Sequence, residues 1–371
     1  MAKQGDNIYK RKDNRYEGRY IKGYKPNQKP LYGYVYGKSY DAVLKKLEPF
    51  KRIYQRQQNA TGFSGMFSDY AITWLENTAR EKEIKQSTYG SYYRDIHNHI
   101  IPELGGKLPH MLSETDLKQF VDKLKNKGLS GGTIANIMRR VSAIIAKARE
   151  DGTVLEDICK KVRMPYCKKK KITVLTRTAQ YALERVCEQE KTGLLPLLAL
   201  YTGMRIGEIS ALQWADVDLE EGLLYVRRTA QRLNHYGGDE TKTTLIFSSP
   251  KTESSERIIA LSQKIISYLN EHKKNANSAY VISCKGRFAE PRVCQYRFER
   301  LLQKAGIERV SFHSLRHTFA TRCLEEGMDV KTLSELMGHS GVEMTLKYGK
   351  SLTEHKKRAV MLLDNVYQAV V

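Results

Sequence analysis

Two polar stretches divide this chain of 371 residues into three segments, each with its own hydrophobic pattern. The first stretch, residues 57–62, is rich in Gln and Asn, and the second contains consecutive lysines at residues 168–171. A dense lysine run repels itself and seldom packs, so we expect linkers at both places. The chain is also too long for one ordinary core, and two or three domains are expected.

The net charge of +22 and the sequence pI of about 9.6 favour a polyanionic partner. Nucleic acid is the first candidate and an anionic membrane surface the second. No apolar run approaches the roughly 20 residues that cross a bilayer, which argues against a membrane protein. The polar N-terminus and the six scattered cysteines, none in a CxxC pair, predict a cytoplasmic protein with reduced thiols and no secretory signal.

Residues 1–60 carry 15 Lys and Arg against 5 Asp and Glu. Alternating patterns at residues 16–20 and 32–36 predict strands joined by a turn at 24–30, and Ser39 is a suitable cap for the helix that follows. We therefore expect a small three-stranded sheet with one helix. Such a basic ribbon fits the major groove of DNA, and the alternative is a solubilising appendage without DNA contact.

Residues 64–156 have apolar residues at helical spacing, which predicts a four-helix bundle. Residues 113–116 are typical of a capped helix start, whereas the two glycines at 131–132 predict a break. Residues 172–371 indicate a mixed, mainly helical domain with a small antiparallel sheet. Its expected elements are a helix at 194–212, strands at 223–226, 244–247 and 258–261, and helices from residue 293 onward. The expected fold class is multidomain α+β.

Four short stretches of the last segment carry residues suited to phosphodiester chemistry. They are residues 202–208 (TGMRIGE), 313–318 (HSLRHT), 336–339 (LMGH) and Tyr348. Arginine forks match phosphate oxygens and keep their proton at neutral pH. Because tyrosine is a poor nucleophile at a pKa near 10, a cationic pocket must favour its phenoxide. The set therefore favours DNA strand transfer through a phosphotyrosine, with no metal, ATP or other cofactor.

Each stretch alone also has a structural interpretation. Arg205 is the kind of arginine that is often buried for structural reasons, and a lone Tyr348 belongs more often to a core. His313 and Arg316 lie on one face of a helix, where they pair structurally or act on a phosphate. Gly338 is typical of a helix C-cap that lets His339 turn inward. The ordered set, rather than any member, carries the prediction.

The chain resembles the tyrosine recombinases, or phage-type integrases, at residues 202–209, 250–252, 313–320 and 336–340 and at Tyr348. The resemblance spans the C-terminal half in family order. It implies a catalytic set of Arg205, Lys251, His313, Arg316, His339 and Tyr348. In this set Tyr348 is the nucleophile that forms a 3′-phosphotyrosyl bond, and Arg205 and Arg316 clamp the scissile phosphate. Lys251 protonates the leaving 5′ oxygen, and His313 and His339 assist proton transfer and hold the phosphate. Lys242 is the competitor for the role of Lys251.

The resemblance also implies three domains: an arm-type DNA-binding sheet domain at 1–60, a helical core-binding (SAM-like) domain at 64–156 and a catalytic domain at 172–371. The expected function is site-specific recombination by the integrase of a phage or integrative element on double-stranded DNA with core and arm sites. A homo-tetramer that exchanges a C-terminal helix and an accessory bending or excision factor are expected partners. The alternatives are a type IB topoisomerase, a non-catalytic DNA-binding relative, and a metal enzyme that uses His313 and His317.

Overall fold

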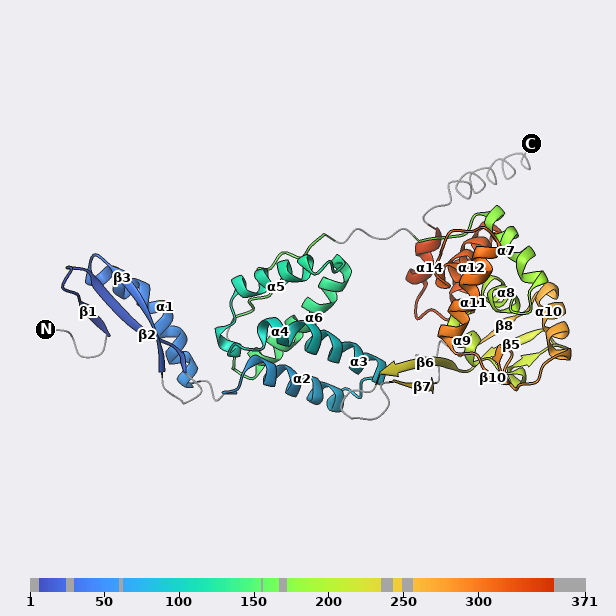
Figure 1. The fold of residues 1–371 in the computed structure, drawn as a ribbon. Coiled ribbons are helices and arrows are strands. Elements are labelled where there is room, and N and C mark those ends of the chain that lie inside the picture. The colour runs from blue at the N-terminus through green and yellow to red at the C-terminus, as the bar shows by residue number, and fades with distance from the viewer. Residues whose placement is uncertain are drawn as a thin grey trace, which may run out of the picture. The chain divides into compact units, whose positions relative to one another are not determined.

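The computed structural model of the chain describes residues 7–24, 30–59, 63–154, 156–166, 172–234, 243–248 and 256–349. Contacts divide the chain into two compact units, residues 1–168 and 169–371, and each is described by itself. Helices dominate, and the strands form small sheets (Figure 1). None of the helices in these described ranges is both long and apolar enough to cross a membrane.

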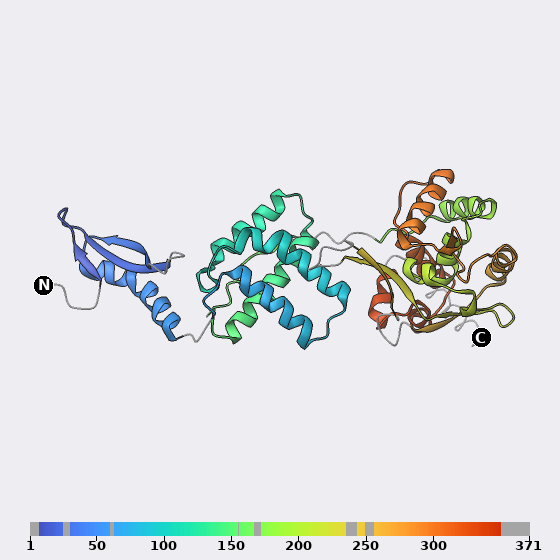
Figure 2. The same cartoon turned by 60° about the horizontal axis from the view of Figure 1, so that its bottom comes forward.

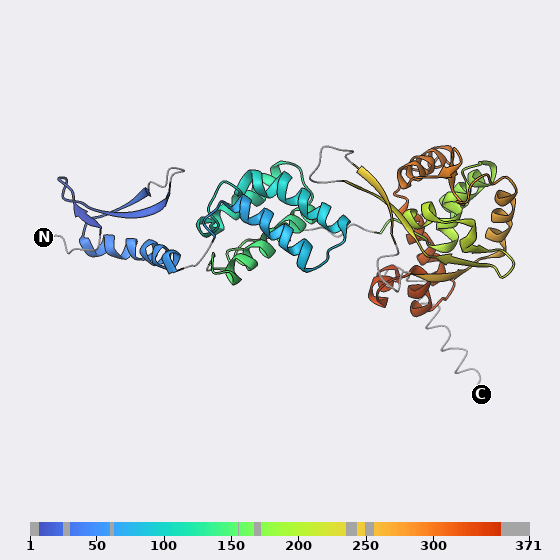
Figure 3. The same ribbon diagram turned by 90° about the horizontal axis from the view of Figure 1, so that it is seen from below.

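The first unit begins with an antiparallel sheet and a helix, as predicted. Its elements are β1 (Ile8–Lys10), β2 (Tyr16–Tyr24), β3 (Pro30–Gly37) and α1 (Tyr40–Asn59). Ser39 caps α1 by accepting a hydrogen bond from the Ala42 amide at 3.2 Å. Val43 and Leu47 are buried against one face of the sheet, along which α1 lies (Figure 3). A Cβ on Gly18 would lie 2.3 Å from Leu47, so glycine permits this close approach.

The helix α1 extends further than the sequence predicts. The linker expected at 57–62 is wrong for its first three residues, because α1 continues to Asn59. The remaining residues of that linker lie outside the described part of the chain. The same applies to most of the turn expected at 24–30 and to the lysines at 168–171.

Residues 63–166 form a compact helical bundle around one apolar core (Figure 2). Its elements are α2 (Phe67–Glu81), α3 (Gln86–Asp95), η1 (Ile96–Ile100), α4 (Ile101–Leu104), η2 (Pro109–Met111), α5 (Glu114–Asn126) and α6 (Gly131–Glu150). The predicted cap is confirmed, because the Ser113 hydroxyl accepts from the Asp116 amide at 3.3 Å. The sequence predicts that Gly131 and Gly132 separate two helices and that the second opens at Thr133, but this helix opens two residues earlier, at Gly131. The helix α6 begins there because Ser130 caps it, accepting from the Thr133 amide at 3.2 Å.

The second unit combines helices with short antiparallel strands. Its helices are α7 (Arg177–Gln189), α8 (Leu194–Thr202), α9 (Ile206–Ala211), η3 (Trp214–Asp216), α10 (Gln263–Lys274), α11 (Pro291–Lys304), α12 (His313–Glu325), α13 (Val330–Met337) and α14 (Val342–Gly349). One sheet has the order β4 (Val217–Asp218), β5 (Leu223–Val226) and β8 (Arg257–Ala260). The pairs β6 (Thr229–Asn234) with β7 (Thr243–Ser248) and β9 (Ser283–Cys284) with β10 (Arg287–Phe288) form two-stranded ribbons.

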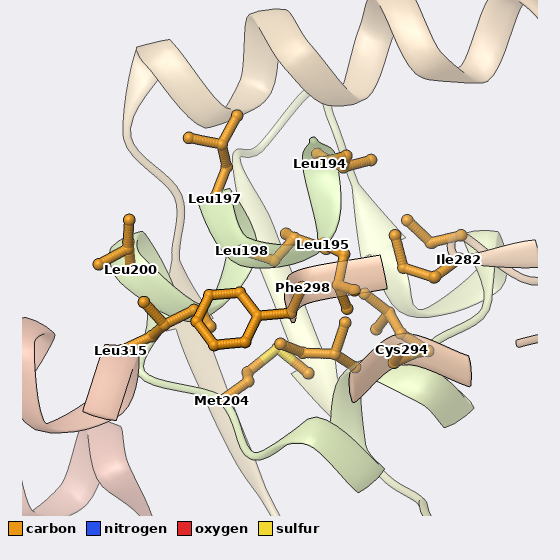
Figure 4. Packing of buried hydrophobic residues seen from close by; sticks show 14 of the residues in the cluster. Leu194, Leu195, Leu197, Leu198, Leu200, Met204, Ile282, Cys294, Phe298 and Leu315 are labelled. Carbon is orange, nitrogen blue, oxygen red and sulfur yellow. The ribbon is translucent and has the colours of Figure 1, made fainter. Parts of the chain in front are cut away.

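The core of this unit surrounds α8, which is buried along almost its whole length. Figure 4 shows the Phe298 ring of α11 among Leu198, Met204 and Leu315, which come from different elements. The single helix expected at 194–212 is wrong, because Gly203 adopts a left-handed φ of 64° that ends α8. A new helix, α9, then begins after Arg205. The break holds Arg205 at a helix N-terminus instead of within a continuous helix.

Candidate active site

The structure brings five of the six expected site residues into one part of the second unit. Arg205 is the N-cap of α9, His313 and Arg316 lie in α12, His339 follows α13, and Tyr348 lies in α14. Helix α12 contacts both α13 and α14, and Figure 1 shows α12 beside α14. Lys251 and its competitor Lys242 lie outside the described residues.

The C-terminal end of α13 holds three arginines from different elements. Its last carbonyls lack partners within the helix and lie at the negative end of the helix dipole. The Leu336 carbonyl accepts from Arg257 Nε at 2.6 Å, and the Gly338 carbonyl accepts from Arg205 Nη2 at 3.4 Å. The Met337 carbonyl accepts from Arg316 Nη2. These three contacts place the guanidinium groups around one helix end.

Glu208 joins two of these arginines. Its Oε1 accepts from Arg205 Nη1 at 2.8 Å and from Arg257 Nη1 at 3.3 Å. Its Oε2 accepts from the Arg205 amide at 2.8 Å and from Arg257 Nη2 at 2.9 Å. Burial alone would raise the pKa of Glu208, but the two guanidinium groups outweigh that effect and hold the pKa below its ordinary value. The Glu208 carboxylate is therefore ionised, and its hydrogen bonds orient the Arg205 side chain.

The two arginines expected at the phosphate differ in exposure. The Arg316 side chain is only 1% exposed, and its Nη1 donates to the Gly203 carbonyl. Burial, with a contribution from nearby Arg205, lowers the pKa of Arg316 to about 9, which still leaves it protonated at neutral pH. Arg205 keeps 37% of its side chain exposed. A buried cation beside an accessible one is a suitable receptor for an anion, because the anion offsets the desolvation of the buried charge.

The two expected histidines are neutral near pH 7. Burial, followed by the charges of Arg316 and Arg205, lowers the pKa of His339 to about 4. Its Nδ1 lies 2.8 Å from the Thr345 hydroxyl. The predicted helix end is confirmed, because Gly338 has a left-handed φ of 59° and His339 turns into a buried position. Partial burial and the same two arginines also lower the pKa of His313, although its side chain lies at the surface.

Tyr348 lies in an apolar pocket that also faces the cations. Only 9% of the residue is exposed, and it packs with Phe319 and Met337. Its ring stacks with that of His339 at a centroid separation of 6.2 Å and an angle of 16°. Burial raises the pKa of Tyr348, and the opposing charges of Arg316 and Arg205 reduce this rise without cancelling it. Without DNA the phenol is therefore protonated, whereas a cationic pocket alone would favour the phenoxide.

Three site residues were missed by sequence reasoning. Arg257 is the charged first residue of an otherwise apolar strand, which is the only signal in the sequence that points to it. Thr345 is fully buried and has no distinguishing motif. The spacing of His317 from His313 suggests only a metal ligand, but Nδ1 of His317 lies 3.2 Å from the Tyr348 hydroxyl. Within the ranges that the structure describes, no group of three or more His, Cys, Asp or Glu residues is arranged to hold a metal ion.

Comparisons with known proteins agree with this geometry. Residues 167–355 match the model of the phage integrase family, and residues 66–125 match that of the phage integrase N-terminal SAM-like domain. A tyrosine recombinase XerC-like protein of Caldanaerobacter subterraneus subsp. tengcongensis is 27% identical over 359 residues, which cover 90% of this chain and 91% of the relative. A tyrosine recombinase XerA of Thermococcus kodakarensis is 31% identical over 246 residues, which cover 65% of this chain and 78% of the relative.

Two solved structures share the fold. The Tn1549 transposon integrase in complex with a circular intermediate DNA has a TM-score of 0.69 at 22% identity, covering 80% of this chain and 99% of the other. A lambda integrase dimer bound to a core site has a TM-score of 0.64 at 18% identity, covering 94% and 96%. The chain belongs to the phage integrase family. It is a tyrosine recombinase, an enzyme that breaks and rejoins DNA in site-specific recombination.

Proposed function

We propose that this recombinase integrates and excises a phage or another mobile genetic element, and that Tyr348 is its nucleophile. The observation that carries the assignment is the position of the Tyr348 phenol, which is buried beside His339 and within the electrostatic influence of Arg205 and Arg316. Attack by the phenol oxygen on the scissile phosphate releases the 5′ hydroxyl and leaves a 3′-phosphotyrosyl bond. Because this bond retains the phosphodiester energy, rejoining requires no ATP.

Arg205 and Arg316 clamp the non-bridging oxygens of the scissile phosphate in this proposal. Support comes from the convergence of both guanidinium groups at the end of α13. Support also comes from the buried charge of Arg316, on which Glu208 has only a secondary electrostatic effect. Removal of one preorganised donor of this kind costs about 3 kcal/mol in the transition state. His313 and His339, both neutral without DNA, help to hold the phosphate and to move protons.

Lys251 is the proposed general acid for the leaving 5′ oxygen. It belongs to the connection between β7, which ends at Ser248, and β8, which begins at Arg257 beside Glu208. A lysine on this connection is therefore close in sequence to β8, the strand whose Arg257 contacts the site. Lys242, on the connection between β6 and β7, is the alternative.

Replacement of Tyr348 by Phe tests the nucleophile directly. The variant should form no covalent adduct on a suicide substrate, where wild type accumulates it, because Phe lacks the attacking oxygen. DNA affinity should stay within about twofold, since the ring and its packing remain. An adduct formed by the Phe variant would exclude Tyr348 as the nucleophile.

The general acid can be tested by changing the leaving group. Lys251→Ala should slow cleavage of a normal phosphodiester but cleave a 5′-bridging phosphorothiolate at a rate near that of wild type, because a thiolate leaves without a proton. Lys242→Ala is the matched control and should cleave both substrates normally. Rescue of the Lys242 variant instead would transfer the role to that residue.

The N-terminal sheet is proposed to bind arm-type DNA sites. On the face opposite α1, Tyr34 and Tyr36 are exposed, and the Arg19 guanidinium stacks over Tyr32 at 3.4 Å. A basic three-stranded sheet with such a face fits a major groove. Deletion of residues 1–60 should abolish arm-site binding while core-site cleavage persists, and Arg19→Ala should weaken arm-site binding alone. Full integration by the truncated protein would refute this role.

The remaining assignments concern assembly. We propose that residues 64–156 bind the core site together with the catalytic residues 172–371. Lambda integrase has been solved as a tetramer on a Holliday junction, and we propose a tetramer for this chain as well. Residues 350–371, outside the described part, are proposed to reach a neighbouring subunit. An accessory bending or excision factor and a cytoplasmic location are further expectations. Sedimentation with a Holliday junction, with and without residues 356–371, tests the assembly.

A further inference from the structure

The hydroxyl of the nucleophile has a specific partner outside the residue set expected from the sequence. The Tyr348 oxygen lies 3.2 Å from Nδ1 of His317, one helical turn after His313 in α12. We propose that His317 is a catalytic residue that accepts the Tyr348 proton as the phenol attacks the phosphate and returns it during rejoining. This inference rests on the proposed role of Tyr348.

The two other histidines of the site are less well placed for this proton. Nδ1 of His339 already lies 2.8 Å from the Thr345 hydroxyl, and its ring is stacked nearly parallel to the phenol. His313 meets the His317 ring edge-on, with centroids 4.3 Å apart. Among the described residues, no hydrogen bond joins His313 or His339 to the Tyr348 hydroxyl. His317 thus lies between the phenol and His313, where it can pass the proton outward.

The protonation state of His317 agrees with a role as acceptor. Burial comes first among the causes that lower the pKa of His317 to about 4, followed by the charges of His313 and Arg316. The ring is therefore neutral at pH 7, and with the hydrogen on Nε2 its Nδ1 has a free lone pair. Among the described residues, Tyr348 and, beyond its ring, His339 are further ionisable groups close to His317.

Binding of the DNA substrate raises the pKa of His317, which favours its role as a proton acceptor. A phosphodiester held by Arg205 and Arg316 brings a negative charge next to Arg316, whose charge lowers the pKa of His317. Partial cancellation of the Arg316 charge raises the basicity of the imidazole in the complex, where the proton has to be taken up. The histidine is therefore neutral before DNA binds and a stronger base afterwards.

The proposed step is balanced in atoms and charge. The Tyr348 O–H bond breaks and its proton moves to Nδ1 of His317, while a bond forms between the phenol oxygen and phosphorus. The bond from phosphorus to the 5′ oxygen breaks, and that oxygen takes a proton from the general acid, for which Lys251 is proposed. In rejoining, the 5′ hydroxyl returns its proton to Lys251 as its oxygen attacks phosphorus. The bond from phosphorus to the phenol oxygen then breaks, and His317 returns its proton to that oxygen.

A His317→Asn variant separates proton acceptance from simple orientation. The Asn side-chain oxygen can occupy the position of Nδ1 and accept the hydrogen bond, but it does not take up a proton at neutral pH. Single-turnover formation of the covalent adduct should slow by about 100-fold or more, within the usual range for loss of a general base. The difference in this rate between the variant and wild type should shrink as pH rises towards the pKa of tyrosine, because hydroxide then replaces the missing base.

The matched control is His272→Gln in α10. His272 is also half-buried, and its Nε2 lies 3.1 Å from the Val281 carbonyl, a contact that the Gln amide can keep. This variant should form the adduct at the wild-type rate. In a His317→Gly variant, added imidazoles should restore the rate in proportion to their basicity, which a purely structural role would not produce.

Three results would overturn the inference. They are a His317→Asn variant as fast as wild type, a deficit that does not change with pH, and a rescue independent of imidazole basicity. Faster cleavage by the Asn variant would show that His317 restrains the tyrosine instead of activating it. Failure of wild type to form an adduct would refute the proposed function itself. An adduct in wild type with no effect of His317→Asn would refute the inference alone.

Discussion

Arg257→Met offers a sharp test of how the site is held together. The substitution keeps a long apolar side chain but removes a guanidinium that is 5% exposed. That group donates to both oxygens of Glu208, itself 3% exposed, and to the Leu336 carbonyl at 2.6 Å. The variant therefore removes, in a single change, the hydrogen bonds that join β8 to α9 and to the end of α13.

The expected cost follows from what remains after the change. Removing one member of a buried ion pair costs about 3–5 kcal/mol, because the other charge stays buried. Arg205 still pairs with Glu208 at 2.8 Å, so we expect the lower end, about 3 kcal/mol. For a unit of this size, each kcal/mol lowers Tm by about 2–4 °C, which gives a decrease of roughly 6–12 °C.

The chain provides its own optical probe for this measurement. It has two tryptophans, Trp74 in the first unit and Trp214 in the second. In a Trp74→Phe background, Trp214 fluorescence during urea unfolding reports the second unit alone. Arg297→Met is the matched control, because Arg297 is half-buried and donates to the Ser283 carbonyl at 2.9 Å. Its loss should cost only about 1 kcal/mol. A loss below about 1 kcal/mol for Arg257→Met, or one equal to the control, would refute the reasoning.

Three further changes test the same framework. Glu208→Gln should destabilise the second unit at neutral pH, and urea titrations should show the difference from wild type narrowing below about pH 4. The pKa of Glu208 is lower in the folded state, so its contribution is complete above the unfolded pKa of about 4.3 and is lost as pH falls through the folded pKa. Gly203→Ala should cost more than Gly306→Ala in chemical denaturation. Both glycines have a φ near 65°, but an added Cβ would lie 2.5 Å from Phe319 only at Gly203, and it meets nothing within 4 Å at Gly306. Thr345→Val should cost about 1–3 kcal/mol by leaving the buried Nδ1 of His339 without its partner, and unaltered stability would contradict that contact.

Elements governed by neighbouring residues could be predicted from the sequence. The cap at Ser113 and the strands around Tyr16 and Tyr34 depend on interactions within a few residues or on simple alternation. The predictions at Gly131 and Gly203 differ from the structure in opposite ways. The sequence predicts a break at Gly131, where the helix already begins because Ser130 caps it, and a continuous helix through Gly203, where the helix ends. At Gly203 the φ is left-handed and a Cβ would collide with Phe319, which lies far away in the sequence.

The sequence by itself determined the residue types of the chemistry and their order along the chain, because arginine, histidine and tyrosine in those short motifs have few other uses together. Only the tertiary structure decided how they are held. The contacts of Arg205, Arg257 and Arg316 with distant carbonyls span 133, 79 and 113 residues of sequence, respectively. It also placed His317, and none of the other histidines that the structure describes, within hydrogen-bond distance of the Tyr348 hydroxyl. Hydrogen bonds over such separations depend on how helices pack, and no local pattern records that packing.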